Sequence, residues 1–475
     1  MSSNAHRWLD LSARATARGV RWGGIRALAA ALVVAGSFIP AAAHSPAAAT
    51  PNRIDDFYSP PEGFADSEPG TVLRSREIQA SALQLIPMQV RAWQLLYRTT
   101  DSNGRPYAAV TTVLARNGDR APAAILSYDS MIDAIAPDCM PSRVLRTGAP
   151  WFNPTGDTGP VALSTTASEV PMIAAGLEQN WVVSVPDLGG IENRFLTPRE
   201  PGYVALDGVR AVQNFQQVGA VDRSTPALFW GYSGGGIATS WAAEVQPTYA
   251  PELRVAGMAI GAPVPDFATA VRQGNGSLVA GLVAIGLAGL AQDSPEFAAL
   301  LDKMLTPAGR QMATAAAADC TPQNLLSFPF TDFDSHLTVP LNQVLADPLT
   351  RELLAERTLG QGVPTAPLYL YNGINDELST IESADRLVDR YCRAGTSVTY
   401  QRDPFPSVLS AHTALWALGA PAALAWLRAQ IDDPSSDRAC STQTLSTITT
   451  PEALNTLGPS YIGGTLNAIL AGSTR

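Results

Sequence analysis

Apolar and polar residues alternate along two neighbouring segments of the chain, at positions 89–97 and 107–115. Alternation with a period of two is typical of a β-strand that buries one face. Turn-forming residues separate the two segments, with Asn103 and Gly104 at their centre. The pattern therefore predicts a β-hairpin near the start of the folded chain.

Five later segments are apolar without interruption and end at loop-forming residues, at positions 121–128, 181–185, 227–231, 255–260 and 366–371. Strands that are apolar on both faces belong to a parallel sheet covered by helices. Runs with helical spacing lie between them, for example at positions 203–215. A hairpin followed by alternating strands and helices predicts an α/β fold: a mostly parallel sheet flanked by helices, with its ligand site at the carboxyl ends of the strands.

The alternation stops between positions 263 and 364, where about 100 residues separate two predicted strands and a simple crossover would need far fewer. The segment has a mainly helical pattern, so we interpret residues 263–364 as an inserted helical cap or lid. The α/β core is then expected over residues 71–262 and 365–475. Positions 278–290 of the cap are almost wholly apolar, which predicts a buried helix or, overlapping with it, a lining for an acyl-chain pocket.

The first 43 residues are typical of a cleaved export signal. Five arginines precede an apolar run at positions 27–39, and alanines at 41–43 offer a cleavage site. The apolar run is shorter than the roughly 20 residues that span a bilayer. We therefore predict a signal peptide over residues 1–43, a secreted mature protein that begins near His44, and a flexible, proline-rich lead-in over residues 44–70, with ordered structure from about Thr71.

The charge narrows the class of binding partner. The 475-residue chain has a net charge of −10, and loss of the signal, with its five arginines and the single acid Asp10, makes it about −14. A surface that acidic argues against binding to nucleic acid or to anionic membranes.

The four cysteines form an even set in a chain with an export signal: Cys139, Cys320, Cys392 and Cys440. This favours two disulfides over metal ligands, and the residues alone leave three pairings open. The sequence has no Cys-x-x-Cys or His-Glu-x-x-His pattern. We therefore expect neither a metal site nor a cofactor.

The segment Gly231-Tyr232-Ser233-Gly234-Gly235 joins an apolar strand-like run to a helix-compatible run. This context is typical of a nucleophile elbow, in which small residues let the backbone turn sharply and expose a serine hydroxyl. Ser233 is therefore the candidate nucleophile.

A serine hydroxyl needs a base to remove its proton, and the chain has only four histidines. His6 lies in the expected signal and His44 at its end. His336 lies in the predicted cap. His412 follows the last predicted strand, where an α/β-hydrolase carries its base, so we predict His412 as the base.

The acid that orients the histidine is expected between Ser233 and His412, in a loop after a strand. Asp376 meets both conditions, because it follows the predicted strand at 366–371. Glu377 is the adjacent rival. Asp187 also follows a strand but precedes the serine, so we expect a structural or substrate-loop role for it.

The tetrahedral intermediate of acyl transfer needs hydrogen-bond donors for its oxyanion. The backbone N–H of Gly234, directly after the nucleophile, is one expected donor. The second donor usually comes from the loop after an earlier strand, which here carries Asp129 and Asp133. Spacing alone does not choose between these two residues.

Taken together, these features resemble the secretory lipases of the Candida antarctica lipase A type, within the α/β-hydrolase superfamily. The resemblance extends from about Val90 to beyond Cys440. Its specific marks are Ser127-Tyr128, Asp138-Cys139-x-Pro141-Ser142, the Gly231 to Gly235 motif, Tyr249-Ala-Pro-Glu-Leu253, Asp376-Glu377 and the four cysteines.

The resemblance implies that Ser233, Asp376 and His412 form the catalytic triad. It further implies that Asp133 is the oxyanion residue of the earlier loop and that Gly234 supplies the other donor. A carboxyl group donates a hydrogen bond only when it is protonated, so Asp133 would need a raised pKa.

The resemblance also implies disulfides between Cys139 and Cys320 and between Cys392 and Cys440. The chain departs from the family at Ala411, where a polar residue is common, and throughout the cap. The second departure leaves the acyl-chain preference open.

The sequence thus predicts a secreted serine carboxylic-ester hydrolase, a lipase that acts on acylglycerols through an acyl-enzyme. A lipid or other ester is the expected partner, with transient contact with a lipid interface, and the chain is expected to be a monomer. The alternatives are an acyltransferase with the same triad, a small-ester esterase, or a non-catalytic exported binding protein. A serine, an acid and a histidine in the required order argue against the last of these.

Overall fold

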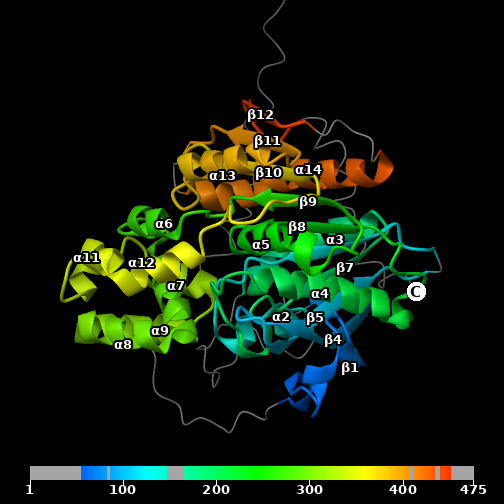
Figure 1. Ribbon diagram of the computed structural model, residues 1–475, viewed down its shortest axis with the longest axis horizontal. Coiled ribbons are helices and arrows are strands. Elements are labelled where there is room, and N and C mark those ends of the chain that lie inside the picture. The colour runs from blue at the N-terminus through cyan, green and yellow to red at the C-terminus, as the bar shows by residue number, and fades with distance from the viewer. Residues whose placement is uncertain are drawn as a thin grey trace, which may run out of the picture. The chain divides into compact units, whose positions relative to one another are not determined.

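The computed structural model describes residues 55–82, 86–118, 120–146, 164–406, 410–433 and 439–450, so the expected signal peptide lies outside the described residues. A ten-stranded sheet runs through the described chain in the order β1-β4-β5-β7-β6-β8-β9-β10-β11-β12 (Figure 1). Its strands are β1 (Val72–Glu77), β4 (Arg91–Thr100), β5 (Pro106–Ala115), β6 (Ala124–Asp129), β7 (Trp181–Pro186), β8 (Ala227–Tyr232), β9 (Val255–Gly261), β10 (Leu368–Gly373), β11 (Val398–Asp403) and β12 (Ser441–Thr444). The short strands β2 (Ser81–Ala82) and β3 (Ile86–Pro87) pair separately.

The sheet is antiparallel at its N-terminal edge and parallel elsewhere. Strands β1, β4 and β5 pair antiparallel, as β5 does with β7, and the strands from β7 to β12 pair parallel. Every residue of β6, β7, β8 and β10 is buried, which explains why these segments are apolar on both faces. The predicted hairpin and the predicted mostly parallel sheet are confirmed.

Helices cover both faces of the sheet (Figure 1). One face carries α4 (Glu200–Asn214), α5 (Gly234–Tyr249) and α13 (Ile381–Arg393), and the other carries α2 (Pro141–Val144), α3 (Thr165–Glu178) and α14 (Ala411–Asp432). Short 3-10 turns connect some of these elements: η3 (Pro137–Cys139), η4 (Gly190–Glu192) and η5 (Gln216–Val218). Because the strands from β6 to β11 run parallel, the loops that follow them meet at one edge of the sheet.

The chain between β9 and β10 is helical and lies beside the sheet (Figure 1). Its helices are α6 (Phe267–Gly274), α7 (Ala280–Asp293), α8 (Pro295–Met304), α9 (Pro307–Ala318), α10 (Thr321–Ser327), α11 (Leu341–Ala346) and α12 (Pro348–Glu356), with the 3-10 turn η6 (Phe333–His336). We refer to residues 263–364 as the cap segment. Helix α7 contains most of the apolar run predicted at 278–290, is largely buried and packs against α8, α9 and α10. Among the described residues, no helix has the length and apolarity needed to cross a membrane.

The prediction of a flexible lead-in over residues 44–70 is wrong for residues 55–70. This segment contains the 3-10 turns η1 (Asp56–Tyr58) and η2 (Phe64–Asp66). Phe57 is buried, and the guanidinium of Arg76 lies 4.0 Å from the centre of its ring. The Asp55 carboxylate forms ion pairs with Arg76 at 2.9 Å and with Arg146 at 3.3 Å. The aromatic and charged residues of the segment thus attach it to β1, despite its proline-rich composition.

Two disulfides connect distant parts of the chain. Cys139 pairs with Cys320 across 181 residues, and Cys392 pairs with Cys440 across 48 residues. This is the pairing that the family resemblance implied. The first bond attaches the loop after β6 to the cap segment, and the second attaches the end of α13 to the approach to β12.

Candidate active site

Ser233 occupies a sharp turn between β8 and α5, with φ 52° and ψ −118°. A non-glycine residue in this region is strained by about 1–3 kcal/mol. The residues two positions before and two positions after Ser233 need to be glycines. A β-carbon on Gly231 would lie 2.1 Å from the carbonyl oxygen of Gly235. A β-carbon on Gly235 would lie 1.8 Å from the carbonyl oxygen of Asp129. The Gly-x-Ser-x-Gly pattern therefore follows from close backbone contacts around the serine.

The side chains of Ser233, His412 and Asp376 form a hydrogen-bonded chain. The Nε2 atom of His412 lies 2.7 Å from the Ser233 Oγ, and its Nδ1 atom lies 2.9 and 3.0 Å from the two carboxylate oxygens of Asp376. All three side chains are buried. Ser233 lies in the turn after β8, Asp376 in the loop after β10 and His412 at the start of α14, which follows β11. All three lie at the edge of the sheet where ligands of α/β proteins bind.

The backbone around the triad fixes its orientation. The Asp376 carboxylate accepts hydrogen bonds from the backbone N–H groups of Leu378 at 2.9 Å and Ser379 at 2.7 Å. The hydroxyl of Tyr232, directly before the serine, donates to the carbonyl oxygen of His412 at 2.6 Å. An acceptor carboxylate at Nδ1 favours the tautomer in which Nε2 is free to accept the serine proton.

Glu377, the adjacent rival of Asp376, contacts the backbone rather than the imidazole. Its carboxylate accepts the backbone N–H of His412 at 3.3 Å and the hydroxyl of Ser410. These groups lie at the start of α14, where an acid compensates the unpaired amides and the positive end of the helix dipole. Glu377 therefore supports the helix that carries the histidine.

The other residues considered from the sequence have partners elsewhere. The Nδ1 atom of His336 lies 2.9 Å from the Ser335 hydroxyl within the cap segment. The buried carboxylate of Asp187 accepts hydrogen bonds from the backbone N–H and the hydroxyl of Ser142, at 2.9 and 2.5 Å. Neither residue contacts Ser233.

The pKa of His412 is raised above its ordinary value. Burial by itself would lower the pKa, because it disfavours the charged imidazolium, but the Asp376 carboxylate outweighs this effect through its charge and its hydrogen bond. The ring is thus placed to accept a proton and to hold the resulting charge.

The loop after β6 places Asp133, and not Asp129, beside Gly234, the residue that follows Ser233. Asp129 turns into the core, where its carboxylate accepts hydrogen bonds from the Ser127 and Thr239 hydroxyls, both at 2.7 Å. A β-carbon on Gly234 would lie 1.9 Å from the Asp133 Oδ1. The Asp133 carboxyl therefore lies against the first residue of α5, where backbone N–H groups have no partner within the helix.

Burial raises the pKa of Asp133 to about 6, while the nearby His412 opposes the shift. Asp133 has a backbone φ of 42°, which is uncommon for a residue with a side chain. A carboxyl group with a raised pKa retains its proton at higher pH than an exposed one and can then donate a hydrogen bond.

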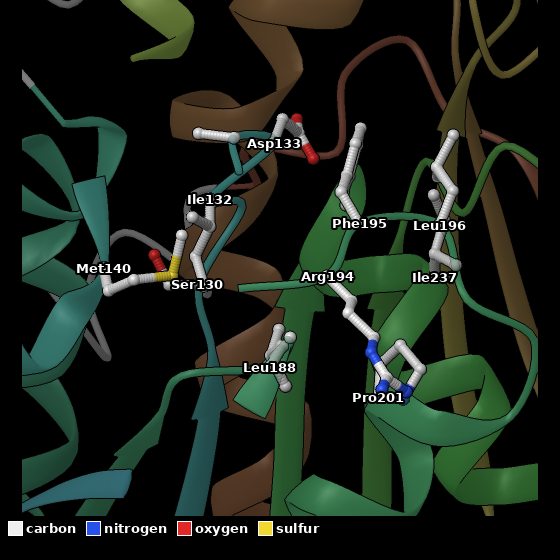
Figure 2. Close-up of a pocket in the computed structure, with 13 residues that line it drawn as sticks. Ser130, Ile132, Asp133, Met140, Leu188, Arg194, Phe195, Leu196, Pro201 and Ile237 are labelled. Atoms are coloured by element: carbon white, nitrogen blue, oxygen red, sulfur yellow. The ribbon is translucent and has the colours of Figure 1, made fainter. Parts of the chain in front are cut away.

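A pocket opens beside Asp133 and Gly234, and most of its lining is apolar. Figure 2 shows Asp133 at the top of the view and Pro201 at the bottom. The lining residues are Ser130, Ile132, Asp133, Ala134, Met140, Leu188, Gly189, Arg194, Phe195, Leu196, Pro201, Gly234 and Ile237. Helix α7 lies behind the Phe195–Leu196 part of this wall, since a β-carbon on its Gly289 would be 2.9 Å from the Phe195 carbonyl oxygen.

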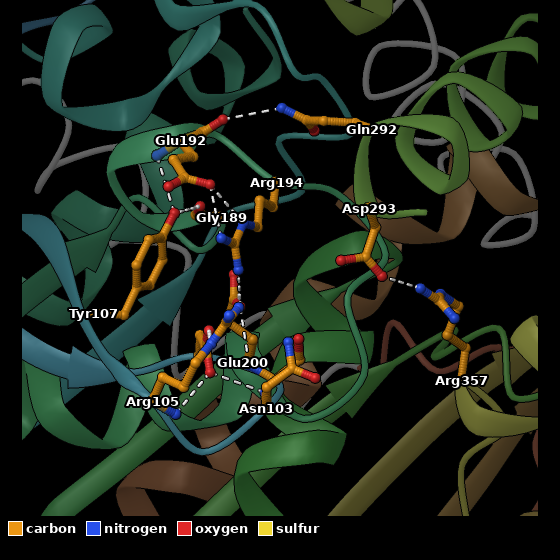
Figure 3. Close-up of polar contacts among 12 residues, drawn as sticks. Asn103, Arg105, Tyr107, Gly189, Glu192, Arg194, Glu200, Gln292, Asp293 and Arg357 are labelled. Carbon is orange, nitrogen blue, oxygen red and sulfur yellow. Dashed lines mark hydrogen bonds and ion pairs between the residues drawn. The ribbon is translucent and has the colours of Figure 1, made fainter. Parts of the chain in front are cut away.

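Arg194, directly before Phe195 and Leu196, fixes its loop through contacts with Glu192, Glu200 and Tyr107, which Figure 3 shows. It forms ion pairs with Glu192 at 2.7 Å and with the buried Glu200 at 2.9 Å, and its guanidinium lies 4.7 Å from the centre of the Tyr107 ring. Gln292, on α7, donates to the carbonyl oxygen of Glu192 at 3.0 Å. Sequence reasoning missed this network, because isolated charged residues in a predicted loop carry no distinguishing pattern.

The part of the chain that the structure describes holds no group of three or more histidine, cysteine or acidic residues arranged to bind a metal ion.

The chain is similar to known proteins in sequence and in fold. A family model described as secretory lipase matches residues 158–437. The chain is 39% identical over 377 residues to a protein of Mycobacterium tuberculosis named as a "probable inactive lipase", covering 78% of this chain and 81% of that protein. It is 35% identical over 424 residues to Lipase A of Arthroderma benhamiae, covering 88% of each. The X-ray structure of Candida antarctica lipase A matches with a TM-score of 0.74 and 26% identity, over 88% of this chain and 95% of that one.

These similarities define an α/β-hydrolase of the lipase or esterase class. The chain belongs to the secretory lipase family. The predicted fold and the predicted family are both confirmed.

Proposed function

We propose that the chain is a secreted serine carboxylic-ester hydrolase that cleaves acylglycerols through an acyl-enzyme intermediate. The observation that carries this proposal is the hydrogen-bonded chain from the Ser233 Oγ to the His412 Nε2 at 2.7 Å and from the His412 Nδ1 to Asp376. A serine hydroxyl is a weak nucleophile until a base within hydrogen-bond distance removes its proton. Here the base, His412, is buried, is oriented by Asp376 and lies within hydrogen-bond distance of the Ser233 hydroxyl.

In the first half of the reaction, the Ser233 Oγ attacks the ester carbonyl carbon while the His412 Nε2 takes its proton. The carbonyl oxygen becomes negatively charged, and the backbone N–H of Gly234 and the protonated carboxyl of Asp133 donate hydrogen bonds to it. His412 then gives its proton to the leaving alcohol, and Ser233 remains acylated. The Asp376 carboxylate stabilises the imidazolium during both proton transfers.

In the second half, water attacks the acyl-enzyme with His412 again acting as the base. The same two donors stabilise the second tetrahedral intermediate, and its collapse releases the carboxylic acid and restores the serine. This scheme needs no cofactor, because every proton moves between the histidine and the reacting oxygens.

The apolar lining of the pocket supports an acyl chain as the part of the substrate that enters it. The pocket lies beside Asp133 and Gly234, and its lining includes neither Ser233 nor His412. The leaving alcohol has to stay within reach of the His412 Nε2, so the acyl group is expected to extend towards the opposite, apolar side. Burying each methylene of such a chain contributes about 0.8 kcal/mol.

The relative named as a probable inactive lipase makes a direct test of activity necessary. Ser233→Ala is expected to abolish covalent labelling by a fluorophosphonate probe. Ser240→Ala serves as the matched control, because Ser240 is also buried in α5 but donates only to the carbonyl oxygen of Gly236. Labelling of the Ser233→Ala protein at the rate of the unmodified protein would overturn the nucleophile assignment.

The substrate class needs a second measurement. Hydrolysis is compared across p-nitrophenyl esters of increasing acyl length and a triglyceride emulsion, with and without an added alcohol. Release of fatty acid from the emulsion supports the lipase. Activity restricted to acetyl and butyryl esters supports a small-ester esterase, and formation of new ester at the expense of free acid supports an acyltransferase.

We also propose that residues 1–43 direct export and are then removed, and that the mature chain contacts lipid interfaces briefly. Two strongly exposed apolar side chains support the second point: Leu326 is 58% exposed and Phe330 is 66% exposed, both in the cap segment. Mass spectrometry of the protein from culture medium tests the first point, since a mature terminus near His44 is expected.

A further inference from the structure

The loop that carries Asp133 is held from two sides. On the core side, the fully buried Glu169 of α3 accepts hydrogen bonds from the hydroxyl of Ser130 and from the backbone N–H of Met131, the latter at 3.3 Å. The hydroxyl of Thr165 donates to the carbonyl oxygen of Met131. These contacts fix the first half of the loop, but none of them reaches Asp133 itself.

On the other side, the cap segment reaches Asp133 through one side chain. Thr321 is the first residue of α10 and is buried. Its hydroxyl donates to the carbonyl oxygen of Ile132 at 2.7 Å and to that of Asp133 at 2.6 Å. A hydroxyl has one hydrogen, so the two carbonyl oxygens share it as a three-centre bond.

These two carbonyl groups lie on either side of the Asp133 α-carbon. Each peptide unit is planar, so the backbone at Asp133 has two soft dihedrals, φ and ψ, and these set the relative orientation of the two carbonyls. A donor that binds both oxygens therefore restrains both dihedrals. The restrained residue is the one that has φ 42°, a conformation it would otherwise tend to leave.

The threonine is itself held rigidly. Its neighbour Cys320 is bonded to Cys139, which lies six residues after Asp133 in the loop after β6. Helix α10 also packs tightly on α7, since a β-carbon on Gly281 would lie 2.3 Å from the carbonyl oxygen of Asn324. The disulfide and the packing of α10 on α7 therefore hold the Thr321 hydroxyl in place.

We propose that Thr321 is a positioning residue that holds Asp133 in the conformation needed to donate to the oxyanion. The inference rests on the proposed function, because it assumes that Asp133 is an oxyanion donor. Thr321 acts through the backbone of Asp133 and touches neither the substrate nor the reacting atoms. The cap segment thereby contributes a residue that supports the active site.

The proposal predicts a specific kinetic effect. Thr321→Val keeps the size and branching of the side chain and removes the hydroxyl. We expect kcat to fall about 10- to 100-fold, since a displacement of about 1 Å at a catalytic group has an effect of this order. KM should change less than about threefold, because an oxyanion donor acts on the transition state and the apolar lining of the pocket is unchanged.

The control is Thr358→Val. Thr358 also lies in the cap segment and donates its hydroxyl to a backbone carbonyl, that of Leu354, at 3.1 Å. Thr358 lies two residues before Gly360, whose backbone N–H donates to the Glu244 carboxylate. Glu244 lies ten residues along α5 from Gly234, which is about 15 Å at 1.5 Å per residue. Thr358 is therefore remote from the proposed oxyanion donors. This variant should retain kcat and KM. Thr321→Ser, which keeps the hydroxyl, should restore kcat to within about threefold of the unmodified protein.

A double-mutant cycle separates positioning from a general structural role. If Thr321 acts through the Asp133 carboxyl, Thr321→Val should have less than about a twofold effect on kcat when Asp133 is already alanine. Loss of the same factor in both backgrounds would overturn the proposal. So would an unchanged kcat in the single Thr321→Val variant, provided that Asp133→Ala has lost activity.

Failure of the underlying function gives a different result, namely that Asp133→Ala or Ser233→Ala retains full kcat. If Thr321→Val does not fold, Thr321→Ala and Thr321→Ser form the replacement pair, because they differ by the hydroxyl alone. An equal kcat for these two variants would overturn the proposal, and a loss confined to the alanine variant would support it.

Discussion

The carboxyl group of Asp133 lies directly against the backbone of Gly234, so closely that a β-carbon on Gly234 would be 1.9 Å from the Asp133 Oδ1. No β-carbon approaches an oxygen atom this closely, so a side chain at this position would displace the carboxyl group. The convergence of the two proposed oxyanion donors therefore depends on the absence of a side chain at Gly234.

Gly234→Ala is accordingly expected to lower kcat by about 100-fold, the effect of losing one oxyanion donor. The variant should still fold, because alanine favours a helix and Gly234 is the first residue of α5. Steady-state kinetics on a soluble ester and a thermal melt measure the two effects. Gly286→Ala, in α7, is the control, since its β-carbon would meet only ordinary contact at 3.5 Å from Leu196. A Gly234→Ala enzyme with full kcat would rule out this account of the oxyanion site.

The protonation of Asp133 leads to a prediction about pH. The pKa of Asp133 is raised to about 6, and its carboxyl donates a hydrogen bond only when protonated, so the donating form is lost as the pH rises. The pKa of His412 is raised above its ordinary value, and its imidazole can act as the base only when neutral, so the form that accepts a proton increases as the pH rises. The two requirements oppose each other, and kcat/KM should be bell-shaped, with apparent pKa values that belong to the pair.

Asp133→Asn tests this assignment, because an amide donates at every pH. The alkaline fall in kcat/KM should disappear and leave a single rising limb. That limb should lie at the same pH as the acid limb of the unmodified enzyme or at higher pH, because Asp133 loses its proton before His412 in the unmodified pair, so the first proton loss of the pair sets the acid limb. An alkaline fall that persists unchanged in Asp133→Asn would assign it to another group.

Sequence patterns predicted the buried centre of the fold better than its edges. Strands β6, β7, β8 and β10 are buried on both faces and were recognisable as apolar runs. The edge strands β1 and β12 pair on one side only and were not recognisable from the hydrophobic pattern. The sequence of β12 is Ser-Thr-Gln-Thr and is fully exposed, so its pairing with β11 depends on backbone hydrogen bonds that leave no hydrophobic pattern.

The same limit applies within the site. The order of Ser233, Asp376 and His412 along the chain predicted three side chains that the structure brings together. Choosing between Asp129 and Asp133 needed either family knowledge or the fold, because both acids follow the same strand. Thr321 had no signal in the sequence, since its role depends on where the cap segment contacts the loop after β6.

The buried carboxyl groups predict how stability depends on pH. Burial raises the pKa values of Asp129 and Glu169 to about 7 and that of Asp187 to about 6. In the unfolded chain these groups titrate near pH 4. Between these values the folded state binds more protons than the unfolded state, so the free energy of unfolding decreases as the pH rises, by up to about 1.4 kcal/mol per pH unit for each group.

The melting temperature is therefore expected to be higher near pH 5 than near pH 8. Glu169→Gln removes one of these titrating groups and should reduce the difference between the two melting temperatures. Calorimetry of both proteins at several pH values measures the slope. A melting temperature that rises between these pH values would show that the buried carboxyl groups do not control stability.

The exposed apolar residues of the cap segment predict a difference between soluble and emulsified substrates. Leu326 and Phe330 lie four positions apart, and Phe330 has φ 56°, stabilised by a hydrogen bond from its backbone N–H to the carbonyl oxygen of Ser277 at 2.8 Å. Combining Leu326→Gln with Phe330→Asn removes the apolar surface, and asparagine tolerates the positive φ. Hydrolysis of a triglyceride emulsion should fall several-fold, because each buried leucine or phenylalanine side chain contributes roughly 1.5–3 kcal/mol to partition into lipid. Activity on a soluble ester should remain unchanged.

Val363→Gln, which replaces another exposed apolar side chain near the end of the cap segment, should leave both activities intact. Equal losses on both substrates in the double variant would place these residues in the active site and not at the lipid surface.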